Sequence, residues 1–315
     1  HNFGSVMQAY ALKRTVEDLG NECVIINFRP VAQLDKYSLF PKMYGMKYFA
    51  KSAAQLLAHP LARSRTFFQY EEFISKNLTD APEINYIRDL IAVEGDILLT
   101  GSDQVWGYQI PEFIKSKEDI RPAYYYSFAN GRKVSYAPST GTATAAQLSS
   151  YANLIQEYSH VSVREKKATS LVSALFGRPV ECVLDPTFLV GEDVYQSLID
   201  SDIAGNRASE GYCLIYSLQG LRARKDWQKL VSLIQDDIGL PMISASHFVP
   251  LKGVGIKPVF DIGPIDVLAL FKNASYVLTD TYHGTLFSIH FDKQFVTFTP
   301  NRDDPRIDDI TDRLG

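Results

Sequence analysis

The apolar residues of this chain alternate between two spacings, and this alternation limits the fold more than any other feature of the sequence. Short continuous runs, such as residues 96–100 and 212–216, are typical of buried strands. Between such runs lie segments such as residues 6–19 and 227–238, where apolar residues recur every three or four positions, as on one face of a helix. Strands separated by helices predict βαβ units and therefore parallel sheets.

Some local predictions follow from the same patterns. Residues 23–27 form an apolar run that predicts a strand, and residues 2–5 resemble a loop. The segment 274–278 predicts a strand that leads into a turn, and a helix is expected to begin at Thr285.

The length of the chain predicts two domains. At 315 residues it exceeds the ~150 residues of a typical domain. The polar segment 200–210 is the natural boundary, because it is rich in Ser, Asp, Gly and Asn. We therefore predict two α/β domains with mainly parallel sheets that face each other across a cleft, over residues 1–200 and 201–315.

Composition and charge exclude several classes of protein. A net charge of −4 gives no general basic excess for binding nucleic acid. No apolar run approaches the ~20 residues that a membrane-spanning helix needs. The three cysteines form no CxxC pair and lie in apolar runs, so we expect buried thiols in a reducing compartment such as the cytoplasm.

Residues 42–75 differ from the rest of the N-terminal half, because lysine and arginine alternate there with tyrosine and phenylalanine. An ordinary solvated helical insertion is the preferred interpretation, since such patterns are common on globular proteins. The alternative is a basic, aromatic surface that meets an anionic or lipid-linked acceptor.

Candidate binding residues lie in four loops that follow strands and lead into helices, because ligands bind at the carboxyl ends of the strands in open parallel sheets. These loops are residues 2–5, 101–106, 164–166 and 279–285. The sharpest candidate is the turn that contains His283 and Gly284, because the next helix offers free N–H groups to an anion. A histidine there can hold a phosphate or carboxylate and donate a proton, and Asp280 or the ligand can favour its charged form. The alternative is a capping histidine beside a structural glycine.

Two further strand ends carry polar residues. The Arg164 guanidinium can bind a carboxylate or phosphate through two parallel hydrogen bonds, or it can form a surface salt bridge with Glu165 or another acidic residue. Ser102 and Asp103 can cap the next helix or orient a sugar hydroxyl. Trp106 can stack on a sugar, but a place in the core is the preferred interpretation.

Several common catalytic motifs are absent from the sequence. It contains no GxGxxG, GxxxxGK[ST], GxSxG or HExxH motif, which argues against dinucleotide, P-loop, serine-hydrolase and zinc-peptidase chemistry. His283 and His290 lie about two helical turns apart, too far to share one metal ion. We therefore predict no metal site.

Six motifs, in this order, resemble the polysaccharide pyruvyl transferase family over nearly the whole chain. They are residues 2–12 (NFGSVMQAYAL), 101–106 (GSDQVW), 134–137 (VSYA), 162–166 (SVREK), 184–187 (LDPT) and 279–285 (TDTYHGT). The GSDQVW motif and the histidine-glycine turn are the most specific. The departures are mild and include Phe3 where tyrosine is usual and Thr281 where serine is usual.

The resemblance implies a glycosyltransferase-B-like fold of two Rossmann-like domains. It also implies transfer of pyruvate from phosphoenolpyruvate to two hydroxyls of a sugar in a cell-surface polysaccharide or its precursor, with release of phosphate. The N-terminal domain, with its insertion near 42–75, would bind the saccharide acceptor, which can be lipid-linked, and the C-terminal domain phosphoenolpyruvate. No cofactor is expected beyond this co-substrate, and the location would be the cytoplasm or the inner face of the membrane.

The same resemblance assigns roles to individual residues. His283 and Arg164 are the expected catalytic residues, with His283 as proton donor or phosphate ligand and Arg164 on the carboxylate or phosphate. The expected substrate-binding residues are Asn2, Gly4, Ser102, Asp103, Gln104, Asp280, Tyr282, Gly284 and Thr285.

Two other functions stay open. One is a glycosyltransferase that uses a nucleotide-activated sugar, for which Asp261 and Asp266 are the available acidic residues to hold a ribose. The other is a carbohydrate-binding relative without catalytic activity.

Overall fold

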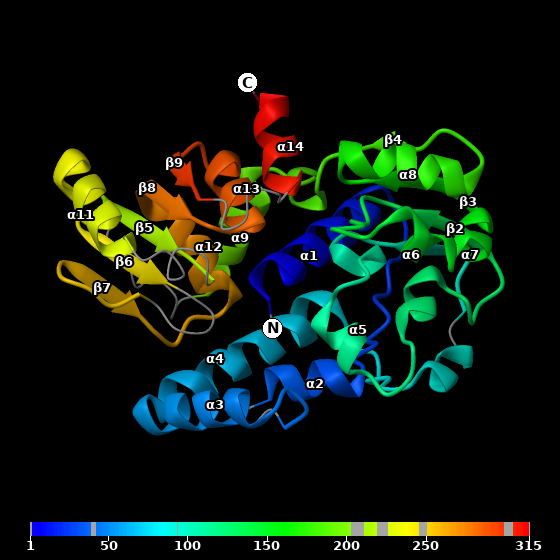
Figure 1. Ribbon diagram of the computed structural model, residues 1–315, viewed down its shortest axis with the longest axis horizontal. Helices are drawn as coiled ribbons and strands as arrows, with labels where there is room; N and C mark the ends of the chain where they lie inside the picture. Colours follow the sequence, from blue (N-terminus) through cyan, green and yellow to red (C-terminus); the bar gives the residue numbers. More distant parts are fainter. Residues whose placement is uncertain are drawn as a thin grey trace. The chain divides into compact units, whose positions relative to one another are not determined.

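The computed structural model describes residues 2–38, 42–92, 94–202, 211–218, 226–245, 251–298 and 305–314 (Figure 1). The chain forms two compact units. The first comprises His1–Met7, His59–Phe73 and Val190–Gly315, and the second comprises Gln8–Ala58 and Ile74–Leu189. Most of the predicted linker, residues 203–210, lies outside the described residues, and the two domains bounded at residue 200 stay a prediction.

The first unit is built on a parallel sheet with the strand order β7-β6-β5-β8-β9. Its strands are β5 (Tyr212–Tyr216), β6 (Met242–Ala245), β7 (Ile256–Val259), β8 (Ala274–Thr279) and β9 (Gln294–Thr297). Its helices are the first turn of α1 (Phe3–Asp18), α4 (Pro60–Phe73), α9 (Glu192–Ser201), α11 (Trp227–Ile238), α12 (Pro264–Asn273), α13 (Tyr282–His290) and α14 (Pro305–Leu314).

The central strand β5 is buried along its whole length, which explains its uninterrupted apolar sequence. Helix α11 contributes Val231 to the cluster that Cys213 and Leu278 form on one face of the sheet. The helix ends at Gly239, whose φ of 64° is a left-handed conformation that glycine adopts without strain. The sequence therefore predicted both this strand and the end of this helix.

Helix α4 belongs to the first unit because polar contacts hold it there. Arg65 forms an ion pair with Asp261 at 3.2 Å, and Gln69 donates to Asp266 at 3.0 Å. A Cβ atom on Gly263 would lie 2.7 Å from that of Gln69, so α4 approaches the start of α12 as closely as a glycine permits. These contacts link a segment of the N-terminal half to the C-terminal sheet.

The second unit is built on a parallel sheet with the order β1-β2-β3-β4. Its strands are β1 (Ile97–Thr100), β2 (Arg132–Ser135), β3 (Tyr158–Val163) and β4 (Glu181–Cys182). Its α-helices are the rest of α1, α2 (Val31–Tyr37), α3 (Met46–Ala58), α5 (Pro111–Lys115), α6 (Ala145–Ser149), α7 (Ala152–Gln156) and α8 (Lys166–Phe176). Shorter helical turns are η1 (Ile74–Leu78), η2 (Ile87–Ala92), η3 (Gln104–Trp106), η4 (Arg121–Tyr125) and η5 (Pro186–Phe188).

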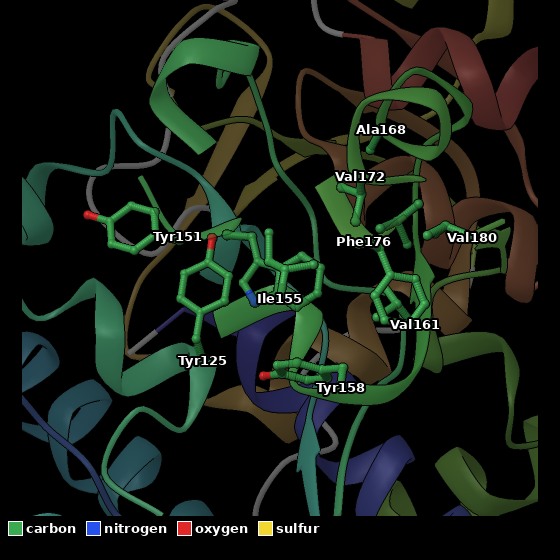
Figure 2. Close-up of a cluster of buried hydrophobic side chains, with 11 residues drawn as sticks. Tyr125, Tyr151, Ile155, Tyr158, Val161, Ala168, Val172, Phe176 and Val180 are labelled. Carbon is green, nitrogen blue, oxygen red and sulfur yellow. The ribbon is translucent and has the colours of Figure 1, made fainter. Parts of the chain in front are cut away.

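Aromatic rings form much of the core of the second unit (Figure 2). Tyr125 stacks between Trp106, at 5.3 Å, and Tyr151, at 5.2 Å, with the rings nearly parallel. The edge of Tyr158 meets Trp106 at 5.7 Å, and its hydroxyl hydrogen-bonds with that of Thr100 at 2.6 Å. Trp106 is therefore a core residue, which confirms the preferred interpretation of its sequence position.

The predicted fold class, α/β with two parallel sheets, is confirmed, but some local predictions are wrong. Of the three cysteines expected to be buried, only Cys213 is, and Cys23 and Cys182 are half-buried. Residues 23–27 join no strand ladder, and the nearest pairing is one parallel bridge between Phe28 and Ile84. Helix α1 already begins at Phe3, so residues 2–5 are not a loop, and α13 begins at Tyr282 rather than Thr285. No helix in the described part of the chain is long and apolar enough to cross a bilayer.

Candidate functional site

At the carboxyl edge of the first unit's sheet, two neighbouring loops are joined through Asp280. Strands β5 and β8 pair in parallel, so the residues that follow them lie at the same edge. The Asp280 carboxylate accepts hydrogen bonds from the Ser217 hydroxyl at 2.5 Å and the Leu218 N–H at 2.9 Å. Burial raises the pKa of Tyr216, the last residue of β5, and the charge of Asp280 adds to this shift. Asp280 thus braces the turn, and its contact with substrate stays a prediction.

The turn after Asp280 is shaped by Thr281 and Gly284. The Thr281 hydroxyl caps helix α13 by accepting the Gly284 N–H at 2.8 Å. A Cβ atom on Gly284 would lie 2.1 Å from Thr279 Oγ1, so a larger residue cannot occupy this position without displacing the strand end. The glycine of the predicted turn therefore allows helix and strand to pack closely.

Replacing Thr281 with alanine removes this cap. We expect the free energy of unfolding to fall by about 1 kcal/mol, because the Gly284 N–H loses its partner. The matched control is Thr281→Ser, which keeps the hydroxyl and should unfold like the parent protein. Urea denaturation of both variants tests the cap, and an equal loss for serine and alanine would assign the effect to the methyl group instead.

The His283 imidazole lies where the N-termini of two helices meet. His283 is the second residue of α13, and a Cβ atom on Gly4, in the first turn of α1, would lie 2.0 Å from its Nδ1. Asn2 precedes α1, and its side-chain oxygen accepts the Ser5 N–H at 3.4 Å. Each helix start carries about half a positive charge and N–H groups that favour an anion. The structure thus brings together Gly4 and His283, which lie in two separate motifs of the sequence, and Asn2 lies at the start of the same helix as Gly4.

Tyr282, the neighbour of His283, contacts an arginine that was not among the predicted site residues. The ring edge of Tyr282 meets the His283 ring at 5.2 Å and 81°, and the Arg306 guanidinium lies over Tyr282 at 5.6 Å. Only the helical pattern of α14 and its basic residue could have indicated Arg306. Thr285, in contrast, is fully buried, and its hydroxyl hydrogen-bonds with that of Thr297 at 2.9 Å, which is a packing role.

At the carboxyl edge of the second unit's sheet, Arg164 is buried in a polar cluster. Its Nη1 donates to Asp185 Oδ2 at 2.7 Å, to Ser102 Oγ at 3.3 Å and to Gln8 Oε1 at 3.4 Å. Its Nε lies 3.5 Å from Glu165. The arginine is therefore part of a buried ion pair with Asp185 rather than of a surface salt bridge, and its contact with an anionic substrate stays a prediction.

The loop after β1 has a strained backbone. Asp103 has φ 74° and ψ −178°, a conformation that is rare outside glycine, and its carboxylate accepts the Gln104 N–H at 2.8 Å. The Ser102 hydroxyl donates to the carbonyl of Ala137, which itself has φ 55°. Gln104 lies beside Gly141. Strain of this kind often accompanies functional loops, and the contact of Ser102, Asp103 and Gln104 with substrate stays a prediction.

Two polar residues of the Arg164 cluster were missed as site residues. Gln8 lies on the buried face of α1 and Asp185 follows β4, and both are almost fully buried. The sequence pattern that could have indicated Gln8 is a side-chain amide among the apolar positions of a helix. The pattern that could have indicated Asp185 is a carboxylate directly after a predicted strand. Asp185 also accepts from the Thr187 N–H at 3.0 Å and from its hydroxyl at 2.9 Å.

The acidic residues that were weighed for a nucleotide ribose have other partners. Asp266 accepts the Gly263 N–H at 2.8 Å and the amide of Gln69, and Asp261 pairs with Arg65. In the described ranges, no group of three His, Cys, Asp or Glu side chains is arranged to hold a metal ion.

Comparisons with known proteins place these motifs in context. A family model described as polysaccharide pyruvyl transferase matches residues 2–302. A comparison with curated proteins finds no match. Among solved structures, the chain is similar to E. coli heptosyltransferase WaaC with ADP-2-deoxy-2-fluoro heptose, at 13% sequence identity and a TM-score of 0.41, over 96% of this chain and 89% of that chain. A structural similarity this low supports no inference about chemistry.

Proposed function

The chain belongs to the polysaccharide pyruvyl transferase family, and we propose that it transfers a pyruvyl group from phosphoenolpyruvate to two hydroxyls of a saccharide. The observation that carries this proposal is the position of His283, whose imidazole lies at the meeting of the N-termini of α1 and α13. Phosphoenolpyruvate is a small, strongly anionic molecule, and helix N-termini with a histidine between them suit its phosphate.

The proposed reaction assigns the proton and the leaving group. A proton is added to the methylene carbon of phosphoenolpyruvate, which makes the central carbon electrophilic. Two sugar hydroxyls form bonds to that carbon, and the bond to the phosphate oxygen breaks. Of the two protons that the sugar hydroxyls lose, one returns to the group that protonated the methylene carbon. The other leaves with phosphate as hydrogen phosphate. His283 supplies the first proton, an effect typically worth about 10²–10⁴-fold in rate, or stabilises the departing phosphate, typically worth about 10²–10³-fold.

The other predicted residues are proposed to act around this centre. Tyr282, Gly284 and Thr285 shape the first turn of α13, and Arg306 adds positive charge beside Tyr282. On the second unit, Ser102, Asp103 and Gln104 are proposed to face the saccharide acceptor. The acceptor is proposed to belong to a cell-surface polysaccharide or its precursor, and the reaction uses phosphoenolpyruvate as a co-substrate without a further cofactor.

Ligand titration tests the proposal directly. Isothermal titration with phosphoenolpyruvate, UDP and CMP, each alone, should give heat of binding with phosphoenolpyruvate only. Phosphate release should then appear when saccharide acceptors are added. Nucleotide binding without phosphoenolpyruvate binding would favour a nucleotide-sugar glycosyltransferase, and binding without phosphate release from any acceptor would favour a carbohydrate-binding relative.

Exchanging Arg164 for lysine separates its two roles. If the guanidinium holds phosphoenolpyruvate, we expect KM to rise by about tenfold or more, because a point charge replaces a two-bond fork and one charge-assisted hydrogen bond is worth about 1.5–3 kcal/mol. The control is Arg14→Lys at an exposed position of α1, which should change neither KM nor stability.

Steady-state kinetics and urea denaturation are measured on both variants. An unchanged KM with a lower unfolding midpoint would show that Arg164 serves only its buried ion pair with Asp185.

A further inference from the structure

One stretch of this acidic chain carries only positive charge. Residues 36–70 contain six Lys or Arg residues and no Asp or Glu, although the whole chain has 36 acidic and 32 basic residues. The stretch includes helix α3 and most of helix α4. A segment of this kind attracts anionic surfaces at a distance set by the ionic strength.

Helix α3 exposes apolar side chains on one face. Met46 is 79% exposed and Leu57 is 85% exposed, and Ala50 between them is also exposed. Positions 46, 50 and 57 are spaced by four and seven residues, so they lie along the same side of the helix. Tyr48 is exposed as well. The Tyr48 ring also contacts Tyr44 at 5.8 Å, whereas Met46 and Leu57 are mostly exposed to solvent.

Helix α4 exposes a second apolar stripe. Leu61 and Phe68 are 68% and 66% exposed and lie seven residues apart, on the same side of the helix. Arg65 lies between them and is also largely exposed, with its Nη1 in the ion pair with Asp261. The opposite side of α4 carries Tyr70 and Phe73, which are buried, so α4 packs through that side and not through the exposed stripe.

From these observations we propose that α3 and α4 bind the surface of an anionic lipid bilayer, each through its own exposed stripe. Exposed aliphatic and aromatic side chains on helices within a basic stretch are typical of interfacial membrane binding. Helix α3 contains no acidic residue, and the two glutamates of α4, Glu71 and Glu72, lie in its last turn, beyond Leu61 and Phe68. A nucleic acid is less suited, because the stripes are mainly aliphatic and give few rings for base stacking. A symmetric dimer is less suited, because it would place the same basic stretch of two copies face to face.

This proposal does not depend on the transferase reaction. It uses none of the residues proposed to bind phosphoenolpyruvate or the saccharide, and it would hold for a protein without activity. If both proposals are correct, the surface would bring the enzyme to acceptors that are anchored in a membrane.

Vesicle co-sedimentation of the full chain tests the proposal. We expect binding to phosphatidylcholine vesicles that contain about one quarter phosphatidylglycerol, and binding at least about tenfold weaker to phosphatidylcholine alone. Binding to the anionic vesicles should fall as sodium chloride is raised, because salt screens the basic stretch. Equal binding to both kinds of vesicle, or binding to neither, would overturn the proposal.

The double variant Leu57→Gln, Phe68→Gln addresses the stripes themselves. It should reduce binding to anionic vesicles by about tenfold or more, because both side chains lose contact with the acyl region. The matched control is Leu233→Gln, which changes an exposed leucine of α11 and should bind like the parent protein.

Equal binding of the double variant and the parent protein would contradict the proposal. So would a concentration-dependent dimer that the same double variant abolishes, because the stripes would then be an interface between copies. Both outcomes are measured on protein that unfolds in urea like the parent protein. Neither depends on phosphoenolpyruvate binding, so failure here is distinct from failure of the proposed function.

Discussion

The His283→Ala variant is expected to lose about 100-fold or more of the rate of phosphate release, because general acid catalysis contributes about 10²–10⁴-fold and one charge-stabilising donor about 10²–10³-fold. The variant should fold, since His283 lies at a half-buried helix start and the cap from Thr281 is kept. The measurement is the initial rate of phosphate release from phosphoenolpyruvate at saturating acceptor. A rate near that of the parent protein would remove His283 from the mechanism.

Two companion variants make this result specific. His160→Ala changes an exposed histidine in β3 and should leave the rate unchanged. His283→Gln keeps a hydrogen-bond donor but no group that can transfer a proton near neutral pH. If His283 is the proton donor, glutamine should be as inactive as alanine. If the imidazole only holds the phosphate, glutamine should recover much of the turnover and show its defect mainly in KM.

The sequence was sufficient for the central strand of the first unit's sheet because this strand is buried along its whole length. The run Tyr212–Tyr216 needs no partner to be recognised, since a short apolar run between turn signals fits few other structures. Residues 23–27 have a similar composition but only one bridge nearby, between Phe28 and Ile84. An apolar run reports burial or extended backbone, and the pairing that makes a strand depends on residues far away in the chain.

The helix starts were predicted too late for a local reason. Tyr282, His283 and Gly284 show no helical periodicity, so the pattern begins only after them, although Thr281 is a residue type that commonly caps helices. The same applies at Phe3, whose ring packs on Phe271 and Phe287 at 6.0 and 4.9 Å. Contacts with other elements, and not the local pattern, determine where these helices begin.

For the site too, the sequence indicated the candidate residues but not the residues that they contact. Strand ends identified His283, Arg164 and Ser102 as candidates, because parallel sheets collect functional groups at that edge. The sequence could not show that Arg164 would be paired with Asp185 or that Gly4 would lie against His283. Convergence of Arg164 and His283 on one phosphoenolpyruvate stays a prediction, and the substrate-bound enzyme is the place to test it.

The contact between Gly4 and His283 reverses the expected effect of a Gly4→Ala substitution on the stability of the protein. Alanine is favoured over glycine inside a helix by about 1 kcal/mol, so Gly4→Ala would stabilise α1 if nothing opposed it. Its Cβ atom, however, would lie 2.0 Å from Nδ1, 2.1 Å from Cγ and 2.5 Å from Cε1 of the His283 imidazole. We therefore expect Gly4→Ala to destabilise the protein by about 1–3 kcal/mol, the usual cost of overpacking. Activity should fall about as far as in His283→Ala, because the imidazole must leave its place.

Combining Gly4→Ala with His283→Ala should undo the loss of stability. With the imidazole gone, the new methyl group meets no ring, and the double variant should be at least as stable as His283→Ala alone. A double-mutant cycle from urea denaturation then gives a coupling energy of about 1–3 kcal/mol, within the range for residues in contact. A cycle that closes near zero would mean that α1 and the start of α13 do not hold the imidazole between them. The anion site proposed for phosphoenolpyruvate would then lose the helix start that Gly4 provides.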